Sequence, residues 1–212
     1  MKTAIITGAS VGIGRAAADL FKKANYAVYN LSRRPCDIAG VNNISTDLSD
    51  EASIEAAMEE LRGPVDKSDV VALVHNACQM RKDSALDCDS QDLLAVMQTN
   101  VVAANSINQA LLPLMPQTSS VIYVGSTLSE KAVGGSYSYV ISKHAVVGMM
   151  RATCQDLRGK GIHTTCICPG FTDTEMLRTH LGNDQDVVDS IASMNAFNRL
   201  IDPDEIADLI VW

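Results

Sequence analysis

Tyr139 and Lys143 are the residues whose types and spacing best suit proton chemistry. They lie in a helical pattern, Tyr137–Arg158, so the phenol and the ammonium, four residues apart, share one helix face and can reach one ligand. A free tyrosine has a pKa of about 10, and a neighbouring cation favours the phenolate. The pair therefore predicts a tyrosine that exchanges a proton with a bound molecule. Tyr137 is the rival phenol, but its +4 residue is Ile141.

Ser126 and Asn100 are polar residues placed to join this pair. Ser126 follows a strand pattern, Ser120–Gly125, and so stands at the carboxyl edge where open α/β sheets bind ligands. Asn100 lies inside a long predicted helix, Gln91–Met115, ahead of that strand. Considered alone, Ser126 is interpreted as a turn residue that ends a strand, and Asn100 as a polar helix residue that faces a neighbour. Together with the tyrosine and lysine they predict a catalytic set.

A glycine-rich turn, Thr7–Gly14, follows the first strand pattern and leads into a helix. Its glycines at 8, 12 and 14 allow a sharp turn and close approach to a phosphate, and Ser10 adds a hydroxyl donor. The helix behind them offers free N–H groups and a partial positive charge. Tight turns also use glycine for steric reasons alone. The position after the first strand nevertheless favours a dinucleotide site.

The elements that must position these residues alternate between strand and helix patterns. The strand candidates are rich in Val and Ile, and several are apolar on both faces, as in a covered parallel sheet. They are Thr3–Thr7, Ala27–Leu31, Val41–Ile44, Val70–His75, Ser120–Gly125 and Ile162–Cys168. The helical patterns are Ile13–Ala24, Glu51–Leu61, Gln91–Met115 and Tyr137–Arg158. The alternation predicts a Rossmann-like, doubly wound parallel sheet with helices on both faces, as one α/β domain over 1–212.

The chain ends within a helical pattern. Asp202 suits an N-cap and Pro203 the first turn, and the pattern still runs at Trp212. No strand follows, so we expect the last strand of the sheet to be missing from these residues and the natural chain to continue.

Composition narrows the possible partners. The 212 residues carry a formal charge of −8, which disfavours nucleic acid and anionic membranes. No apolar run reaches the roughly 20 residues of a membrane span, and no signal peptide precedes the first strand, which predicts a cytoplasmic protein. The six cysteines and four histidines lack ligand spacing, so we expect no metal.

These motifs occur in the order typical of the short-chain dehydrogenase/reductase family, which the chain resembles over essentially all of Lys2–Trp212. The landmarks are Thr7–Gly14, Asp47-Leu48, His75-Asn76-Ala77, Asn100, Ser126, Tyr139 with Lys143, and Pro169–Thr174. One departure is Cys78, where the family usually has glycine.

The resemblance implies a role for each catalytic residue. Tyr139 would donate a proton to a carbonyl oxygen, or remove one from an alcohol, while the nicotinamide carries the hydride. Lys143 would hold the ribose and stabilise the tyrosinate, Ser126 would bond the substrate oxygen, and Asn100 would steady a relay water. The implied cofactor contacts are Gly8, Ser10, Gly12, Ile13, Gly14, Ser32, Arg33, Arg34, Asp47, Leu48, Asn76, Ala77, Tyr139, Lys143, Pro169, Gly170, Thr172 and Thr174.

The end of the second strand predicts NADP(H) rather than NAD(H). NAD-preferring members of the fold carry an acidic side chain there, which repels a 2′-phosphate. Here Ser32 is followed by Arg33 and Arg34, with no carboxylate before Asp37. Arginine matches phosphate oxygens, and we rank Arg33 first.

The sequence therefore predicts an NADP-dependent oxidoreductase acting on a ketone, aldehyde or 3-oxoacyl substrate or the matching alcohol. A lid over about 171–201, rich in Met, Leu and Phe, suggests a substrate with an apolar portion. The apolar surface of the two long helices predicts a homodimer or homotetramer. The alternatives are a catalytically idle NAD(P)-sensing regulator on the same fold, and an isomerase or dehydratase using bound NAD.

Overall fold

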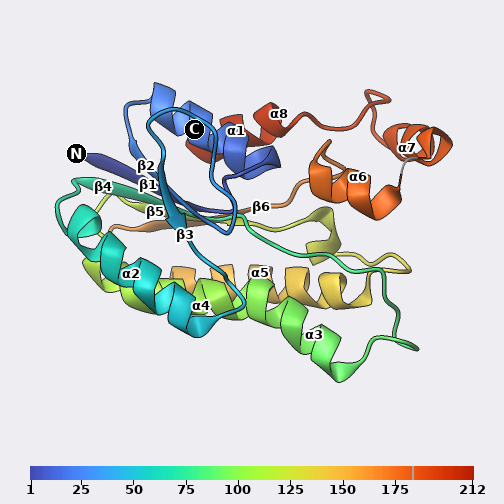
Figure 1. The fold of residues 1–212 in the computed structure, drawn as a ribbon, viewed down its shortest axis with the longest axis horizontal. Coiled ribbons are helices and arrows are strands. Elements are labelled where there is room, and N and C mark those ends of the chain that lie inside the picture. Colours follow the sequence, from blue (N-terminus) through green and yellow to red (C-terminus); the bar gives the residue numbers. More distant parts are fainter. Residues whose placement is uncertain (183) are drawn as a thin grey trace.

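One parallel sheet organises the chain, with its strands in the order β3-β2-β1-β4-β5-β6 (Figure 1). The computed structural model describes residues 1–182 and 184–212. Within those residues the strands are β1 (Lys2–Thr7), β2 (Ala27–Ser32), β3 (Asn42–Ser45), β4 (Val70–His75), β5 (Ser120–Val124) and β6 (His163–Ile167). The strand order reverses between β1 and β4, which is the switch point of a doubly wound fold. The predicted Rossmann-like architecture is confirmed.

Helices cover both faces of the sheet (Figure 1). They are α1 (Gly12–Lys23), α2 (Glu51–Asp66), α3 (Ser90–Met97), α4 (Ala103–Leu111), α5 (Tyr137–Asp156), α6 (Glu175–Leu181), α7 (Gln185–Ala192) and α8 (Pro203–Val211). Alternate residues of β4 take opposite faces: Leu73 packs in a core with α2, α4 and α5, and Val74 in a core with α1 and α8. Both faces are apolar because both are buried.

The expected long helix Gln91–Met115 is interrupted. A π-helical turn, η1 (Gln98–Val102), separates α3 from α4, and a 3-10 turn, η2 (Leu112–Leu114), follows at Pro113. The prediction of one regular helix was therefore wrong at this point. Apolar periodicity does not report the single extra residue that widens a helical turn.

Two further predicted boundaries differ from the structure. Helix α2 continues past the predicted end at Leu61 to Asp66, although Pro64 lies inside it, because Leu61 and Val65 are both fully buried. Strand β6 runs from His163 to Ile167, one residue shorter at each end than the predicted Ile162–Cys168.

The final helix is capped as the sequence predicts. The Asp202 side chain accepts a hydrogen bond from Asp204 N at 3.0 Å, and Asp202 N donates one to the Glu205 carboxylate at 2.8 Å. Helix α8 then packs against α1. Across the described part of the chain, no helix combines the length and apolar character that a membrane crossing requires.

Candidate functional site

Tyr139 and Lys143 lie in the first two turns of α5 and are almost fully buried, at 7% and 2% exposure. Lys143 Nζ donates a hydrogen bond to the Val124 carbonyl at 2.8 Å, which ties the lysine to the carboxyl end of β5. The same ammonium lies 5.5 Å from the centroid of the Tyr139 ring. The two side chains therefore share one helix face, as the spacing predicts.

Ser126 follows β5 and caps a short 3-10 turn, η3 (Thr127–Ser129). Its hydroxyl accepts a hydrogen bond from Leu128 N at 3.1 Å, and its own N–H donates to Ser129 Oγ at 3.2 Å. The Ser126 side chain also lies beside Tyr139, where it acts to lower the pKa of the phenol. Ser126 is thus both a turn residue and a neighbour of the tyrosine.

Asn100 lies in the π-helical turn and joins two parts of the site. Its Nδ2 donates to the carbonyl of Gln79 and to Ser142 Oγ, both at 2.9 Å, and its Oδ1 accepts from Gln79 N at 2.7 Å. Ser142 stands next to Lys143 on α5. The asparagine therefore connects the loop after β4 to the catalytic helix, and the structure brings all four predicted catalytic residues to one edge of the sheet.

The pKa of Tyr139 differs from the sequence-based expectation. Burial raises it above its ordinary value, the nearby Cys78 thiol acts in the same direction, and the Ser126 side chain only partly opposes them. The expected downward shift by Lys143 does not prevail, because burial penalises the charged phenolate. Tyr139 is therefore a neutral phenol near pH 7, which is the form that donates a proton.

The N-terminal end of α5 is held by Asp83. The Asp83 carboxylate accepts a hydrogen bond from Ser138 N at 3.1 Å, and the Asp83 backbone carbonyl accepts one from Tyr137 N at 3.2 Å. Burial works to raise the pKa of Asp83, but the hydrogen bonds that this residue accepts, including the one from Ser138 N, outweigh burial and lower the pKa. The sequence reasoning missed this residue, because a single aspartate in a long loop carries no distinguishing pattern.

The glycine-rich turn is shaped by close packing. Gly8 has φ of +72°, and a Cβ on it would lie 3.0 Å from Ala77 Cα. A Cβ on Gly14 would lie 2.3 Å from the Gly8 carbonyl oxygen, inside contact distance. Asn76 fixes the same turn through hydrogen bonds from Nδ2 to the carbonyls of Thr7 and Gly8, at 3.0 and 3.1 Å.

This turn leaves the start of α1 open to an anion. The N-cap residue, Val11, makes no side-chain capping bond, and the first turn of the helix contains no acidic residue. Uncapped N–H groups at a helix N-terminus bind phosphate readily. Ile13 and Gly12 form this first turn. The residues present therefore fit a dinucleotide phosphate.

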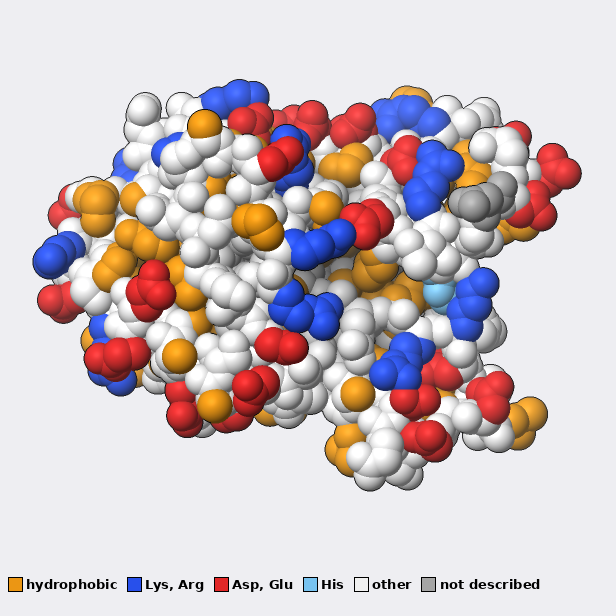
Figure 2. Space-filling view, viewed as in Figure 1, with side chains coloured by type: hydrophobic (Ala, Val, Ile, Leu, Met, Phe, Trp, Pro, Cys, Tyr) orange, Lys and Arg blue, Asp and Glu red, His pale blue; other side chains and the backbone are white. Residues whose placement is uncertain are grey.

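The end of β2 carries the residues expected at the adenosine end of a cofactor. Ser32 Oγ lies 3.3 Å from Ser10 Oγ. Arg34 pairs with Glu175 of α6 at 3.0 Å, whereas Arg33 forms no ion pair within residues 1–182 and 184–212. Figure 2 shows acidic and basic side chains interspersed on one face of the molecule, without a large area of one sign.

Asn30 is a site residue that the sequence reasoning missed. It is fully buried in β2, accepts from Ala9 N at 2.9 Å and donates to the Arg34 carbonyl at 3.2 Å. It thus links the glycine-rich turn to the arginine loop. Its signal was one amide within an otherwise mostly apolar strand.

The remaining predicted cofactor residues surround the same edge. Asp47 accepts from Ser49 N at 2.9 Å and from its hydroxyl at 2.6 Å, and these bonds lower the pKa of Asp47. Thr174 caps α6, and a Cβ on Gly12 would lie 3.1 Å from its methyl group. Leu48 and Thr172 in this region are buried. The Pro169 carbonyl accepts a hydrogen bond from Thr127 N, and Gly170 follows Pro169 in the chain.

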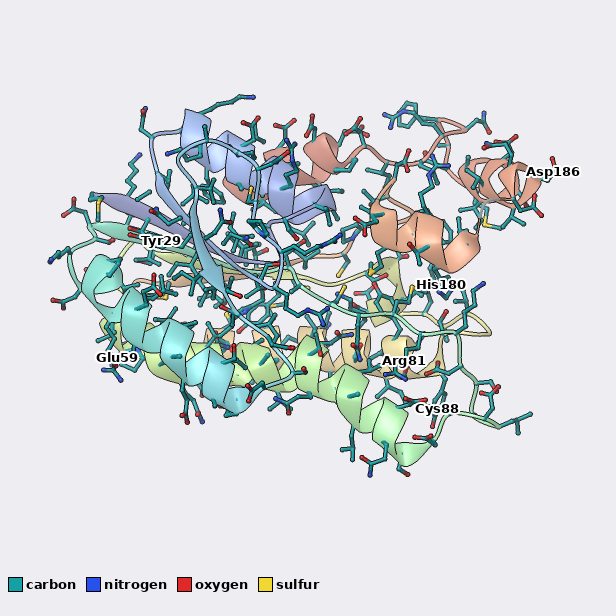
Figure 3. All side chains as sticks on the ribbon, in the orientation of Figure 1. Tyr29, Glu59, Arg81, Cys88, His180 and Asp186 are labelled. Atoms are coloured by element: carbon teal, nitrogen blue, oxygen red, sulfur yellow. The ribbon has the colours of Figure 1, made fainter. Side chains whose placement is uncertain are left out.

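Helix α6 contacts the loop that follows β4. Met176 Sδ lies 3.7 Å from Cys78 Sγ, so the cysteine that replaces the usual glycine touches this helix. Burial and the charge of Lys82 lower the pKa of His180, which lies at the far end of α6, toward the loop that carries Arg81 (Figure 3). Within the described residues, no cluster of three or more His, Cys, Asp and Glu side chains is arranged to hold a metal ion.

Comparison with known proteins agrees with this geometry. A family model described as enoyl-(acyl carrier protein) reductase matches residues 8–212. The chain belongs to the short-chain dehydrogenase/reductase family of NAD(P)-dependent oxidoreductases.

Individual relatives cover the whole chain. It is 27% identical to the 3-oxoacyl-[acyl-carrier-protein] reductase of Escherichia coli (strain K12), across 100% of this chain and 88% of that protein. A short chain dehydrogenase family protein from Francisella tularensis superposes with a TM-score of 0.91 at 25% identity, covering 100% and 90% of the two chains. A putative NAD(P) dependent gluconate 5-dehydrogenase from Beutenbergia cavernae, with bound NADP, superposes with a TM-score of 0.88 at 25% identity. The match covers 99% of this chain and 88% of that chain.

Proposed function

We propose that this chain is an NADP(H)-dependent reductase of carbonyl compounds, with Tyr139 as its proton donor. The observation that carries the proposal is the buried, neutral Tyr139 beside Ser126 and Lys143 at the carboxyl edge of the sheet. A sensor of nicotinamide occupancy has no need for a positioned acid, so the idle regulator is the weaker alternative. The similarity to 3-oxoacyl thioester reductases supports substrates of the 3-oxoacyl type.

The protein groups divide the work of a reduction. Ser126 would donate a hydrogen bond to the substrate carbonyl oxygen and hold it near the Tyr139 hydroxyl. The bound nicotinamide supplies the hydride. Tyr139 would transfer its proton to the same oxygen as negative charge develops there. Lys143, fixed by Val124, would hold the ribose and stabilise the tyrosinate that remains.

Recognition of the 2′-phosphate is assigned to Arg33, with Ser32 and Arg34 beside it. Arg34 is already paired with Glu175, so the unpaired guanidinium of Arg33 is the better phosphate ligand. Charge-assisted hydrogen bonds of this kind contribute about 1.5–3 kcal/mol. Without Arg34, the Glu175 carboxylate would repel a phosphate. Arg33 would therefore favour NADP(H) by binding the phosphate, and Arg34 by neutralising Glu175.

Apolar side chains around α6 and α7 support a substrate with an apolar portion. Phe171 and Met176 are 40% and 36% exposed, and Met194 and Phe197 are 71% and 78% exposed. We infer that 171–201 acts as a lid that covers such a substrate, and that the protein works in the cytoplasm as a homodimer or homotetramer.

A substrate screen tests the proposal. Ketones, aldehydes and 3-oxoacyl thioesters would be incubated with NADPH and the protein, and NADPH oxidation would be followed by the loss of its absorbance. We expect turnover with at least one class, and faster turnover with NADPH than with NADH. NADPH binding without turnover across all classes would favour the sensor.

A further inference from the structure

A buried chain of polar side chains runs behind Lys143. His75, at the end of β4, lies with Nε2 2.8 Å from Asn108 Oδ1. Asn108 Nδ2 donates to the Tyr123 hydroxyl at 2.8 Å, and that hydroxyl lies 3.1 Å from Thr153 Oγ1. The His75 ring also packs against the Tyr123 ring, with centroids 4.9 Å apart. Such a chain in a core is costly unless every member is satisfied.

These partners fix the tautomer of His75. Because the Asn108 amide nitrogen is committed to Tyr123, its oxygen faces the histidine and accepts a hydrogen bond from it. Nε2 therefore carries the proton, and Nδ1 is an acceptor. Burial lowers the pKa of His75 to about 4, so the ring stays neutral near pH 7.

Nδ1 of His75 is buried and has no hydrogen-bond partner among residues 1–182 and 184–212. A small cavity adjoins it, lined among others by His75, Asn100, Tyr123, Val124 and Lys143. The space open to the centre of a water molecule is about 10 Å³, which is the size needed for a single water. Buried waters of this kind bond to polar groups that the protein leaves unpaired.

Lys143, which also lines the cavity, offers the complementary group. Its ammonium has three N–H donors, and the Val124 carbonyl takes one of them. A water between the two residues would satisfy the histidine acceptor and a lysine donor together. Most of the remaining lining is apolar (Leu48, Ala77, Ala103, Ala104, Ile107 and Val146), with Thr7 and Thr99 as its further polar side chains.

We propose that one water molecule in this cavity donates a hydrogen bond to His75 Nδ1 and accepts one from Lys143 Nζ. His75 is thereby a positioning residue: through the water it holds the ammonium in place while Tyr139 loses and regains its proton. The inference rests on the proposed role of Lys143 in the reductase.

A high-resolution crystal structure of the wild-type chain tests the water directly. We expect one ordered water within hydrogen-bond distance of both His75 Nδ1 and Lys143 Nζ. An empty cavity, or a water bonded to only one of the two groups, overturns the inference and leaves the proposed reductase untouched. A bridging water in a protein that reduces no carbonyl would contradict the proposed function alone.

Two matched variants test the consequence for turnover. His75→Gln keeps a donor at the Nε2 position for Asn108 but has no acceptor at the Nδ1 position. His75→Asn places an acceptor at the Nδ1 position but has no donor for Asn108. We expect His75→Gln to lower kcat about three- to tenfold, as the loss of one neutral hydrogen bond implies, and His75→Asn to restore most of that loss.

The two variants also separate positioning from stability. Both remove the ring that packs on Tyr123, and His75→Asn also leaves Asn108 Oδ1 without its donor, so His75→Asn should lower the melting temperature at least as much as His75→Gln. Thr153→Val is the control, because Thr153 meets the chain at its far end and leaves the cavity intact. Equal kcat in the Gln and Asn variants, or a fall in kcat that follows melting temperature alone, would refute a role for the Nδ1 acceptor.

Discussion

At the scale of single residues, the catalytic set depends on where each side chain is buried. Burial raises the pKa of Tyr139, the Val124 carbonyl fixes Lys143, and Asn100 joins Gln79 to Ser142. Spacing along the helix predicts that the tyrosine and lysine meet. It does not predict the direction of the tyrosine pKa, because that depends on the amount of water the fold excludes.

Replacing Tyr139 with Phe should remove turnover and retain cofactor binding. We propose that the phenol acts in proton transfer, and a positioned acid typically contributes about 10²–10⁴-fold to the rate. The measurement is kcat on a substrate found in the screen, together with the dissociation constant for NADPH. Tyr137→Phe is the matched control, since Tyr137 is 40% exposed and should keep near wild-type turnover. A Tyr139→Phe enzyme of similar rate would remove this tyrosine from the mechanism.

Cofactor preference should change when the end of β2 is altered. Ser32→Asp combined with Arg33→Ala introduces a carboxylate that can bond ribose hydroxyls and removes the proposed phosphate ligand. We expect the ratio of kcat/KM with NADPH to kcat/KM with NADH to fall from above one to below one. Arg34→Ala, whose guanidinium is paired with Glu175, should reduce the ratio less than Arg33→Ala alone. Wild-type protein that already prefers NADH would disprove the assignment.

At the scale of elements, the N-terminal turn of α5 positions the tyrosine, and Asp83 positions that turn. The existence and type of the main elements follow from the sequence, because apolar residues recur at clear periods along it. The π-helical turn and the Asp83 contact do not follow from it. Both depend on hydrogen bonds between segments far apart in the chain, which periodicity does not record.

Asp83→Asn should destabilise the protein in a pH-dependent way. The pKa of Asp83 is lower in the folded state than in the unfolded state. The ionised carboxylate therefore stabilises the fold at pH values above its unfolded-state pKa of about 3.9. This stabilisation is lost as the pH falls through the folded-state pKa. At pH 7 we expect a loss of about 1 kcal/mol in the free energy of unfolding, as for a missing helix cap. Urea unfolding at pH 7 and near pH 3 measures it. Asp66→Asn, at the exposed end of α2, should cause no comparable loss, and an equal deficit at both pH values for Asp83→Asn would contradict the reasoning.

At the scale of the whole molecule, the sheet order brings distant segments together. The strand reversal between β1 and β4 places the glycine-rich turn against Asn76, and β5 delivers Ser126 to the same edge. The exposed side chains Leu94 of α3 and Val102 of η1, at 60% and 40% exposure, lie outside this arrangement. They belong to the long helical segment that we propose as an interface between copies of the chain.

Light scattering after size exclusion tests that assembly. We expect the wild-type protein to elute as a dimer or tetramer, and Leu94→Glu with Val102→Glu to shift it toward monomer, because a buried unpaired charge is costly. Leu86→Glu is the control, since Leu86 is 98% exposed in the loop before α3. A monomeric wild type would exclude the proposed assembly.

The π-helical turn also sets the phase between two helices. A turn with one additional residue advances everything beyond it by about 100° relative to a regular helix, since 3.6 residues complete a revolution. Helix α4 presents Ile107 and Asn108 to the core only because of that offset, and α3 presents Val96. Deleting one residue within Gln98–Val102 would restore regular pitch but misalign every side chain on one side of the deletion. The fold should therefore tolerate substitutions that preserve the length of this stretch, those of Asn100 excepted, far better than any change in its length.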